Sequence, residues 1–442
     1  MDLPVIVDFK FRAPAMTPVL QAFMIRFAMP VFSGALMLVL STGMTCAAAP
    51  ATLPDLLRQA VDSHPDVRNK KSELQAAKFG LEGAQWGRYP SFTTELQSGN
   101  SSGQTVNSAP QSVAKLEQSL WTGGRITSQI DLSRAGVAVA EAALREAEQS
   151  VLQQTAQAYF DTLRFEARLT IAQANEAELQ RLLDIIKRRV QAEVSPMTDE
   201  TQASARLRQA VIDRIQTQRQ IDNARLMLYQ MLGKPVGALA SPPLINLGSP
   251  RQDSLVEDAF LFSPERRRLQ AQVETADAQI EISKAQLMPK VVVGVQSIVS
   301  SLYAHQDRTR AYLALQLQTG AGLSGLSAVE TAVARKQAAQ DAILTFERQL
   351  TQQVKSNWTE AQALGEQLEP VRALLAGSDE IVASYLRQFQ VGRKSWLDVL
   401  NAQREKVQAH YGLADVELPL LLLKVKLLLQ SGQLKAEQTS LN

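Results

Sequence analysis

The side chains that most often carry out chemistry in proteins are few in this sequence and lie far apart. The histidines are His64, His305 and His410, and the single cysteine is Cys46. None of the histidines has a second histidine or a cysteine at the spacing that metal sites require. No nucleophile, base and orienting residue form a recognisable set. We therefore expect neither an enzyme nor a metal or cofactor site, and we expect His64 to lie at a helix end.

A glycine-rich segment at residues 320–325 fits the pattern G-x-G-x-x-G, which can bind a dinucleotide. Asp341 follows about twenty residues later, where that pattern places an acidic residue. However, the preceding strand alternates polar and apolar residues, and the following helix is far too long for a crossover to a parallel strand. Gly320 and Gly322 more simply allow the chain to turn from strand to helix.

The composition excludes two further classes of protein. The chain has 442 residues, of which 45% are hydrophobic, and this content is incompatible with a disordered chain. Its 46 lysines and arginines are balanced by 44 aspartates and glutamates. A protein that neutralises nucleic-acid phosphates normally carries a strong basic excess. We therefore expect no nucleic-acid partner.

Residues 1–49 have the features of a secretory signal peptide. Arg26 supplies a positive flank, Val31–Leu40 is mostly apolar, and Ala47–Ala49 offers the small residues that a signal peptidase needs. Cys46 is not preceded by a small residue, so lipidation of the exported chain is not expected. No later apolar run reaches the length of about 18 residues that a transmembrane helix needs. If the protein sits in a membrane, helices are not expected to cross it.

Landmarks in the two halves of the remaining chain fall at a constant separation of 199 residues. They include helix-breaking prolines and glycines and a turn aspartate. The pairs are Pro65 and Pro264, Pro90 and Pro289, Gly123 and Gly322, Arg188 and Arg387, Asp199 and Asp398, Ala203 and Ala402, and Gly233 and Gly432. One ungapped offset shared by several residue types indicates a duplicated structural unit. We predict two repeats, residues 50–248 and 249–442.

The sequence pattern of each repeat predicts the same order of elements. This order is a helix, a β-hairpin, a very long helix and a shorter returning helix. In the first repeat, helical spacing over residues 66–88 stops at Pro90, and alternation of apolar and polar residues then predicts strands around a polar loop. The predicted strands cover residues 91–98, about 114–120, 290–303 and 310–319. The residues expected at the junctions of helix and strand are Pro90, Gly123, Gly124, Pro289, Gly320 and Gly322.

Residues 125–192 and 323–390 predict helices of unusual length. At 1.5 Å per residue, about 67 residues span roughly 100 Å, which coiled coils and tubes need but globular domains do not. Pro370 lies inside the second helix, and a proline there costs about 3 kcal/mol, so we expect a kink or break just before it. The returning helices are predicted over about 199–232 and 396–430.

Four strands of this length can cross an outer membrane but cannot close a barrel alone. An open sheet edge in lipid leaves backbone N–H and C=O groups unpaired, so closure must come from other chains. Three copies would make a barrel of twelve strands continuous with a helical tube. The predicted fold is therefore mainly α with a pair of β-hairpins: a long α-helical coiled-coil tunnel plus a membrane β-barrel with four strands per protomer.

The sequence resembles outer-membrane efflux proteins of the TolC family, the trimeric channel-tunnels of type I secretion and multidrug efflux systems. The motifs that carry the likeness, within about residues 52–432, are His64-Pro65, Tyr89-Pro90, Leu-Trp-Thr-Gly-Gly-Arg at 120–125, Ala-Tyr-Phe-Asp at 158–161, Val391-Gly392 and Leu-Asp-Val-Leu at 397–400. The resemblance implies a homotrimer in the lipid of the outer membrane, with its helical tunnel in the periplasm. It also implies an exit duct for secreted protein or small molecules, docked through a periplasmic adaptor onto an inner-membrane ABC or proton-driven transporter.

By the same resemblance, the helix tips hold a closable periplasmic entrance. Asp398 matches the first of two gate aspartates of the family, and Asn401 stands where the second would be. Lys394 and Asp199 match a basic residue and an aspartate that tie the tip to the other repeat. Phe389 occupies a place where the family often has tyrosine. For Asp398, the alternative is that its carboxylate is only a solvated charge at a turn.

The resemblance assigns adaptor docking to Val391 and Gly392 at one tip, and to Val194 and Ser195 at the other. The first tip lacks the Val-Gly pair of the family. A rival class of protein is an exported periplasmic coiled-coil scaffold without a pore, which would explain the helices but leave the paired hairpins without a role. The sequence before Cys46 favours a secretion-type channel over the lipid-anchored multidrug members.

Overall fold

The computed structural model describes residues 50–97, 111–242, 245, 251–300, 308–317, 321–322 and 324–433. These residues belong to one compact unit. The predicted signal peptide, most of the polar loop of the first hairpin, and Gly320 lie outside the described residues, so the expectations for them stay predictions.

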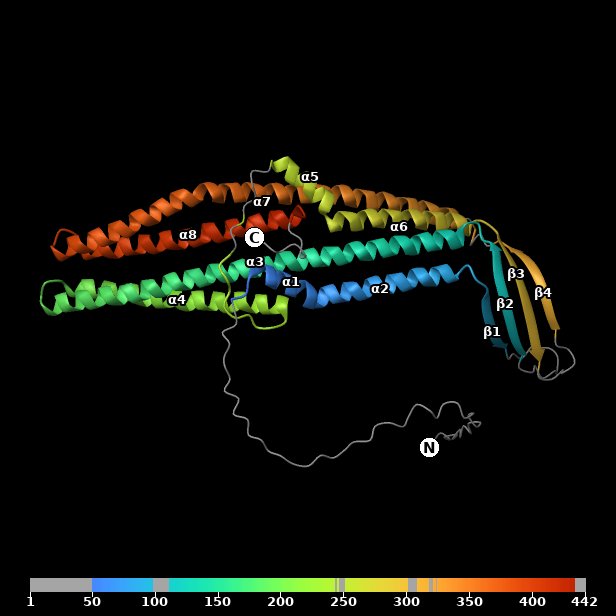
Figure 1. Ribbon diagram of the computed structural model, residues 1–442, viewed down its shortest axis with the longest axis horizontal. Helices are drawn as coiled ribbons and strands as arrows, with labels where there is room; N and C mark the ends of the chain where they lie inside the picture. The colour runs from blue at the N-terminus through green and yellow to red at the C-terminus, as the bar shows by residue number, and fades with distance from the viewer. Residues whose placement is uncertain are drawn as a thin grey trace, which may run out of the picture. The chain divides into compact units, whose positions relative to one another are not determined.

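The described chain is mostly helical and contains one four-stranded sheet (Figure 1). The first half holds α1 (Leu53–Ser63), α2 (Pro65–Trp86), β1 (Ser91–Gln97), β2 (Gln111–Trp121), α3 (Arg125–Gln191) and α4 (Met197–Leu232). The second half holds α5 (Gln252–Phe262), α6 (Pro264–Gln286), β3 (Lys290–Ser300), β4 (Arg308–Gln316), α7 (Ser324–Gln390) and α8 (Trp396–Gln430). The predicted order of helix, hairpin, long helix and returning helix is confirmed in both halves, and the short helices α1 and α5 that precede it were not predicted. Residue 248 as the boundary between the repeats stays a prediction.

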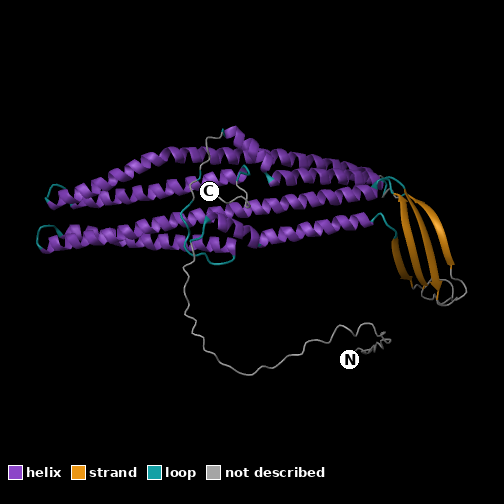
Figure 2. Cartoon of the chain, viewed as in Figure 1, coloured by secondary structure: helices purple, strands orange, loops and turns teal. Residues whose placement is uncertain are grey.

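The helices run side by side, and the sheet lies beyond one end of them (Figure 2). The two long helices, α3 and α7, have 67 residues each. In the first half, α2 and α4 both lie along α3, and in the second half, α6 and α8 both lie along α7. Helix α6 also packs against α3 and so joins the halves. Among the described helices, none combines the length and the apolar character of a membrane-spanning segment.

Side-chain caps mark where α2 and α6 begin. His64 precedes Pro65, the first residue of α2, and its Nδ1 accepts a hydrogen bond from the amide of Asp66 at 3.2 Å. In the other half, the hydroxyl of Ser263 accepts from the amide of Arg266 at 3.2 Å. Each cap satisfies an amide that the first helical turn leaves without a partner. His64 is therefore a helix-end residue, as predicted.

Of the kink or break predicted before Pro370, the break is excluded, because α7 continues through this residue without interruption. Figure 1 shows that α7 curves toward α8 as it nears the tip that the two helices share. Ion pairs to α8 hold α7 close beyond the proline, with Arg372 at 3.5 Å from Glu417 and Asp379 at 2.9 Å from Lys406. Packing against a neighbouring helix can outweigh the local cost of one proline.

The largest core lies where α1, α3, α4 and α8 meet, and it buries Leu57, Tyr159, Leu228 and Val425. The hydroxyl of Tyr159 donates to the backbone carbonyl of Ala240 at 2.8 Å, so this buried polar group is satisfied. Burial raises the pKa of Tyr159 to about 12. Tyr159 therefore stays neutral and joins the core to the segment that follows α4.

The sheet is antiparallel, with the strand order β1-β2-β3-β4. Phe92 of β1 lies opposite Leu116 of β2, which in turn lies opposite Val295 of β3. Strands β1 and β4 are the edges, and each pairs with one strand among the described residues. The four predicted strands are thus confirmed, with ends shifted by up to three residues where the structure describes them.

Candidate functional site

The tip between α7 and α8 is a tight turn closed by backbone hydrogen bonds. Gly392 has a φ of +76°, and the amide of Arg393 donates to the carbonyl of Gln388 at 2.9 Å. Val391 is 70% exposed. The predicted docking residues Val391 and Gly392 therefore lie at the outermost point of this hairpin, open to contact by another protein.

The tip between α3 and α4 follows the same backbone path without the glycine. Glu193 has a φ of +58°, and the amide of Val194 donates to the carbonyl of Arg189 at 2.8 Å. Val194 is 61% exposed, and the Ser195 hydroxyl accepts a hydrogen bond from Arg189 Nε at 3.3 Å. Val194 and Ser195 thus lie at this tip, which lacks the Val-Gly pair, and their docking role stays a prediction.

Asp398 forms a capping box at the start of α8. Its Oδ2 accepts from the hydroxyl of Ser395 at 2.8 Å and from the Ser395 amide at 3.1 Å, and its own amide donates to the Ser395 hydroxyl at 3.1 Å. These hydrogen bonds, followed by the nearby charge of Lys394, hold the pKa of Asp398 below its usual value. The carboxylate is therefore ionised and fixed in place. Asn401 lies about one turn further along α8 and is half-buried.

Within one chain, the described residues place no ion pair between Lys394 and Asp199. The Lys394 ammonium lies over the ring of Tyr385, 4.3 Å from its centroid, where the negative face of the ring attracts it. The amide of Asp199 donates to the carbonyl of Pro196 at 3.1 Å in the first turn of α4. A tie between Lys394 and Asp199 would need a different arrangement or a neighbouring chain.

Phe389 belongs to the core beneath the tips. It is 6% exposed, and its ring centroid lies 5.0 Å from that of Trp396. The Arg189 guanidinium from α3 lies over the same ring at 4.8 Å. With Leu182 and Val399, these aromatics bind the two helix hairpins to each other. The roles of Trp396 and Arg189 were not predicted from the sequence, although two aromatics seven residues apart across a turn were the available signal.

The predicted junction residues lie where the sheet meets the helices. Pro90 and Pro289 directly precede β1 and β3. Gly123 and Gly124 end the turn before α3 with φ values of +60° and +91°. At Gly123, a Cβ atom would lie 2.4 Å from the Cβ of Met288, so only glycine fits there. Gly322 also has a positive φ, at +62°.

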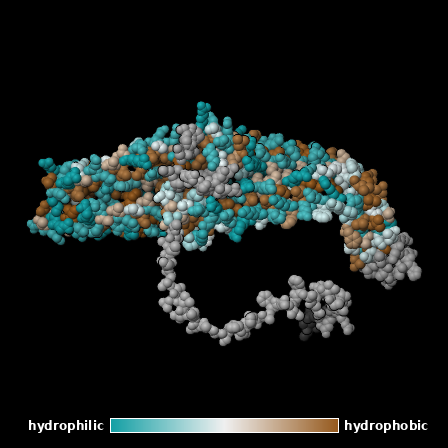
Figure 3. All heavy atoms as spheres, in the orientation of Figure 1, coloured by the Kyte–Doolittle hydropathy of each residue, from teal (hydrophilic) through white to brown (hydrophobic). Residues whose placement is uncertain are grey.

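The sheet has one apolar face and one polar face. Exposed side chains on the apolar face include Phe92, Leu96, Leu116, Val293, Val295, Leu313 and Leu315. Figure 3 shows that apolar residues gather over the end of the unit that carries the sheet. On the polar face, the hydroxyl of Tyr312 donates to Glu117 at 2.9 Å, and Lys115 pairs with the same carboxylate. This cluster was not predicted, because it joins strands that are distant in sequence.

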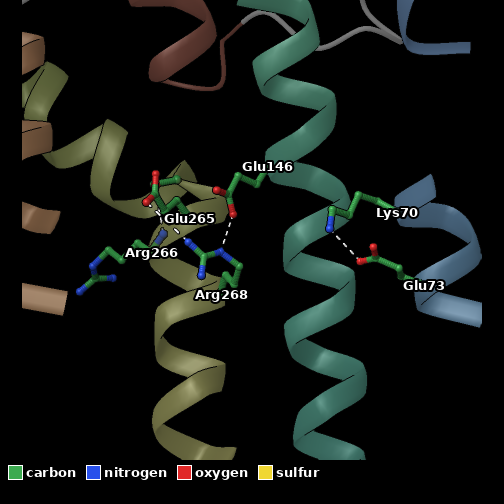
Figure 4. Close-up of polar contacts among 7 residues, drawn as sticks. Lys70, Glu73, Glu146, Glu265, Arg266 and Arg268 are labelled. Atoms are coloured by element: carbon green, nitrogen blue, oxygen red, sulfur yellow. Dashed lines mark hydrogen bonds and ion pairs between the residues drawn. The ribbon is translucent and has the colours of Figure 1, made fainter. Parts of the chain in front are cut away.

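Ion pairs tie α6 to both long helices. Arg268 Nε donates to Glu146 of α3 at 2.5 Å, and Arg268 also lies 3.6 Å from Glu265 (Figure 4). Arg266 donates to Glu347 of α7 at 2.7 Å. Burial, and then the charge of Glu146, raise the pKa of Glu265. Helix α6 is therefore held by charge contacts as well as by packing at the join of the two halves.

The family model "Outer membrane efflux protein" matches residues 56–234 and 255–429, so the chain belongs to this family. One relative is the cobalt-zinc-cadmium resistance protein CzcC of Cupriavidus metallidurans, 22% identical over 369 residues, covering 82% of this chain and 85% of the relative. Another is the outer membrane efflux protein BepC of Brucella suis, 21% identical and covering 74% of this chain and 73% of the relative.

Two solved structures show the same fold. The outer-membrane channel OprN superposes with a TM-score of 0.76 at 19% identity, over 86% of this chain and 89% of that chain. The open state of the Neisseria gonorrhoeae outer membrane channel MtrE superposes with a TM-score of 0.73 at 17% identity, over 86% of this chain and 88% of that chain. The resemblance to the TolC family is confirmed, and this chain is an outer-membrane exit duct of an efflux system.

Proposed function

We propose that three copies of this chain assemble into one continuous pore. The observation that carries the proposal is the sheet, whose edges β1 and β4 each have one side without a partner strand among the described residues. In lipid, unpaired backbone groups cost several kcal/mol each, so β4 of one copy pairs with β1 of the next. Three sheets of four strands then close a barrel of twelve strands.

The two faces of the sheet support this closure. The apolar face, with Leu313 at 70% and Leu315 at 71% exposure, needs a lipid environment, and the polar face lines the pore. The exposed aromatics Trp86, Tyr89 and Trp121 lie where helix and strand meet. Aromatic side chains with a polar group are enriched at membrane interfaces, so these residues mark the periplasmic boundary of the lipid. The scaffold alternative gives neither face a role.

The helices then form a tunnel that reaches through the periplasm toward its partners. We place the contact with a periplasmic adaptor at the exposed tips, on Val391, Gly392, Val194 and Ser195. The adaptor joins the duct to an inner-membrane ABC or proton-driven transporter, which supplies the energy. The chain itself carries out no chemical step in this scheme.

Asp398 is the residue to which we assign the gate of the tunnel. Three-fold symmetry would bring three ionised copies into one ring at the narrow end, and like charges in a constricted mouth attract cations. Asn401 in place of a second carboxylate makes the ring weaker than a double one. Lys394 and Asp199 would pair between neighbouring chains, adding about 0–1 kcal/mol per exposed pair.

Two classes of cargo fit such a duct. The name of the relative CzcC supports small ions or molecules. The residues before Cys46, which do not form a lipidation site, support a secreted protein. Deleting the gene and measuring growth on cobalt, zinc and cadmium salts, alongside the proteins found in the medium, separates the two classes.

The trimer is tested by native mass spectrometry of the protein purified in detergent, supported by chemical crosslinking. We expect the mass of three chains. In a detergent that denatures the barrel, the trimer should dissociate and only the mass of single chains should remain. A monomer that still inserts into a bilayer and conducts ions would contradict the closure of the sheet by neighbouring copies.

A further inference from the structure

The polar face of the sheet carries a second set of charges, far along the chain from the helix tips. Its charged side chains, among those that the structure describes, are Glu95, Lys115, Glu117, Lys290 and Arg310. They are placed on this face by the strand register, since residues directly opposite each other in a sheet point to the same side. Of these five described side chains, three are basic and two are acidic.

One of these carboxylates, Glu117, is held by two partners. Lys115, two residues away on the same strand and face, forms an ion pair with it. Tyr312 reaches it from β4, across β3, and donates its hydroxyl at 2.9 Å. This reach depends on Gly294, because a Cβ there would lie 2.6 Å from both the Cζ and the hydroxyl oxygen of Tyr312. Lys115 and Glu117 thus balance each other against the wall of the sheet.

Arg310 lies on the same face, two residues before Tyr312 on β4. Gln296 stands between it and Lys115 in the strand register, and Arg310 Nη2 donates to Gln296 Oε1 at 3.3 Å. No carboxylate of the described residues forms an ion pair with Arg310 within the chain, and the side chain is exposed. It sits two residues from Arg308, where β4 begins, at the end of the sheet away from the helices.

We propose that Arg310 is a specificity-determining residue that makes the outer part of the pore favour anionic solutes. Tyr312 and Gly294 support this role by keeping Glu117 on Lys115, so that the carboxylate does not cancel the charge of Arg310. The inference rests on the proposed trimer, which places three copies of Arg310 around one pore. Like charges on a wall of low dielectric raise the local concentration of counter-ions. The outer end then has the opposite charge preference to the Asp398 ring.

The reactivity of an engineered cysteine measures this preference without passage through the tip. In a Cys46→Ser background, Ile298→Cys puts a thiol on the polar face. Ile298 lies two residues after Gln296 on β3, so the two side chains share this face. The purified trimer in liposomes is treated with an anionic and a cationic methanethiosulfonate of similar size. Each rate is divided by the rate with free cysteine, so that the ratio of the two reports the local potential alone.

We expect the anionic reagent to be favoured about threefold or more at low salt. The ratio should fall toward one in about 1 M salt, where the Debye length is about 3 Å, and in Arg310→Gln. Tyr312→Phe should lower it partly by releasing Glu117. Lys290→Gln is the matched control, because it removes a cation from the same face at the other end of β3, and it should leave the ratio unchanged.

A second cysteine separates failure of this inference from failure of the trimer. Val295→Cys lies three residues away on the apolar face and should not react with either charged reagent, because lipid covers it. Equal reactivity of Val295→Cys and Ile298→Cys would overturn the barrel. Selective reaction of Ile298→Cys without charge preference, or with a preference that Arg310→Gln leaves intact, would overturn the role of Arg310 alone.

Discussion

The two helix tips share one backbone turn, but they stabilise it differently. Glu193 and Gly392 occupy equivalent positions, 199 residues apart, and both have a positive φ, +58° and +76° respectively. Glycine adopts this conformation freely, whereas another residue pays about 1 kcal/mol. The duplicated chain has therefore kept the path of the turn even where the residue that suits it is missing.

The start of the returning helix differs in the same way. At the second tip, Ser395 and Asp398 form a capping box, but at the equivalent position of the first tip Pro196 provides no side-chain cap. Trp396 is 2% exposed, whereas its equivalent Met197 is 65% exposed. The second tip is thus the more firmly held, and it is the one that positions the carboxylate assigned to the gate.

Truncating the aromatic core beneath the tips should have the largest effect. Trp396→Ala removes a buried ring that packs on Phe389, and we expect a loss of about 3–5 kcal/mol in the free energy of unfolding. Met197→Ala at the equivalent exposed position should change it by at most about 0.5 kcal/mol. Denaturant titration in detergent, followed by circular dichroism, compares the two. Similar losses would show that both tips are held to the same degree.

Removing the cap of α8 should have a smaller effect. Ser395→Ala deletes the hydroxyl that bonds to Asp398, and we expect a cost of about 1 kcal/mol. Ser395→Thr retains a capping hydroxyl and serves as the control. If the alanine variant matches the threonine variant in the same titration, the capping box does not stabilise the tip.

Relieving the strained turn of the first tip should stabilise the chain. Glu193→Gly removes the penalty of a non-glycine residue at positive φ, for a gain of up to about 1 kcal/mol. The reciprocal change, Gly392→Ala, should cost about the same amount at the second tip. A higher midpoint for the first variant and a lower one for the second are expected, and any shift of both in one direction would contradict the shared turn.

The smallest effect concerns pH. The folded pKa of Asp398 is lowered from the ordinary value of 3.8 by the bonds from Ser395. Its ionised form therefore adds stability above about pH 3.8, and this contribution is lost as the pH falls through the lower folded value. Asp398→Asn should flatten the plot of the free energy of unfolding against pH in that acidic range. Above pH 5, about one unit above the ordinary pKa, the shape of the plot should stay unchanged and serves as the control. If the variant and the native chain have identical plots, Asp398 does not cause the pH dependence of stability in this range.

The element order could be predicted from local signals. These signals are prolines and glycines at a fixed spacing, a change of period from helix to strand, and two long segments with helical spacing. Each reflects the local stereochemistry of the chain. The choice between a kink and a break at Pro370 could not be predicted, because contacts such as that between Arg372 and Glu417 depend on how α7 packs on α8. Propensity alone does not contain that information.

The candidate site was predictable in part. The positions of Asp398 and Gly392 followed from turn residues and from the family resemblance, and both lie at a tip. The burial of Phe389 against Trp396 and the reach of Tyr312 over Gly294 were not foreseen. The reach of Tyr312 depends on the pairing of distant strands, whereas Phe389 and Trp396 lie seven residues apart across a turn and left a signal that was not used.

The central claim, that this chain forms a pore with Asp398 at its narrow end, is tested most directly by single-channel recording in planar bilayers. The purified native protein should give discrete conductance steps that favour cations at low salt, where charges are least screened, and that multivalent cations block. Asp398→Ala should lower both the cation preference and the block, while Asp415→Ala, far from the tip on the same helix, should leave them unchanged. The absence of conductance steps in the native protein, or an unchanged preference in Asp398→Ala, would contradict the account.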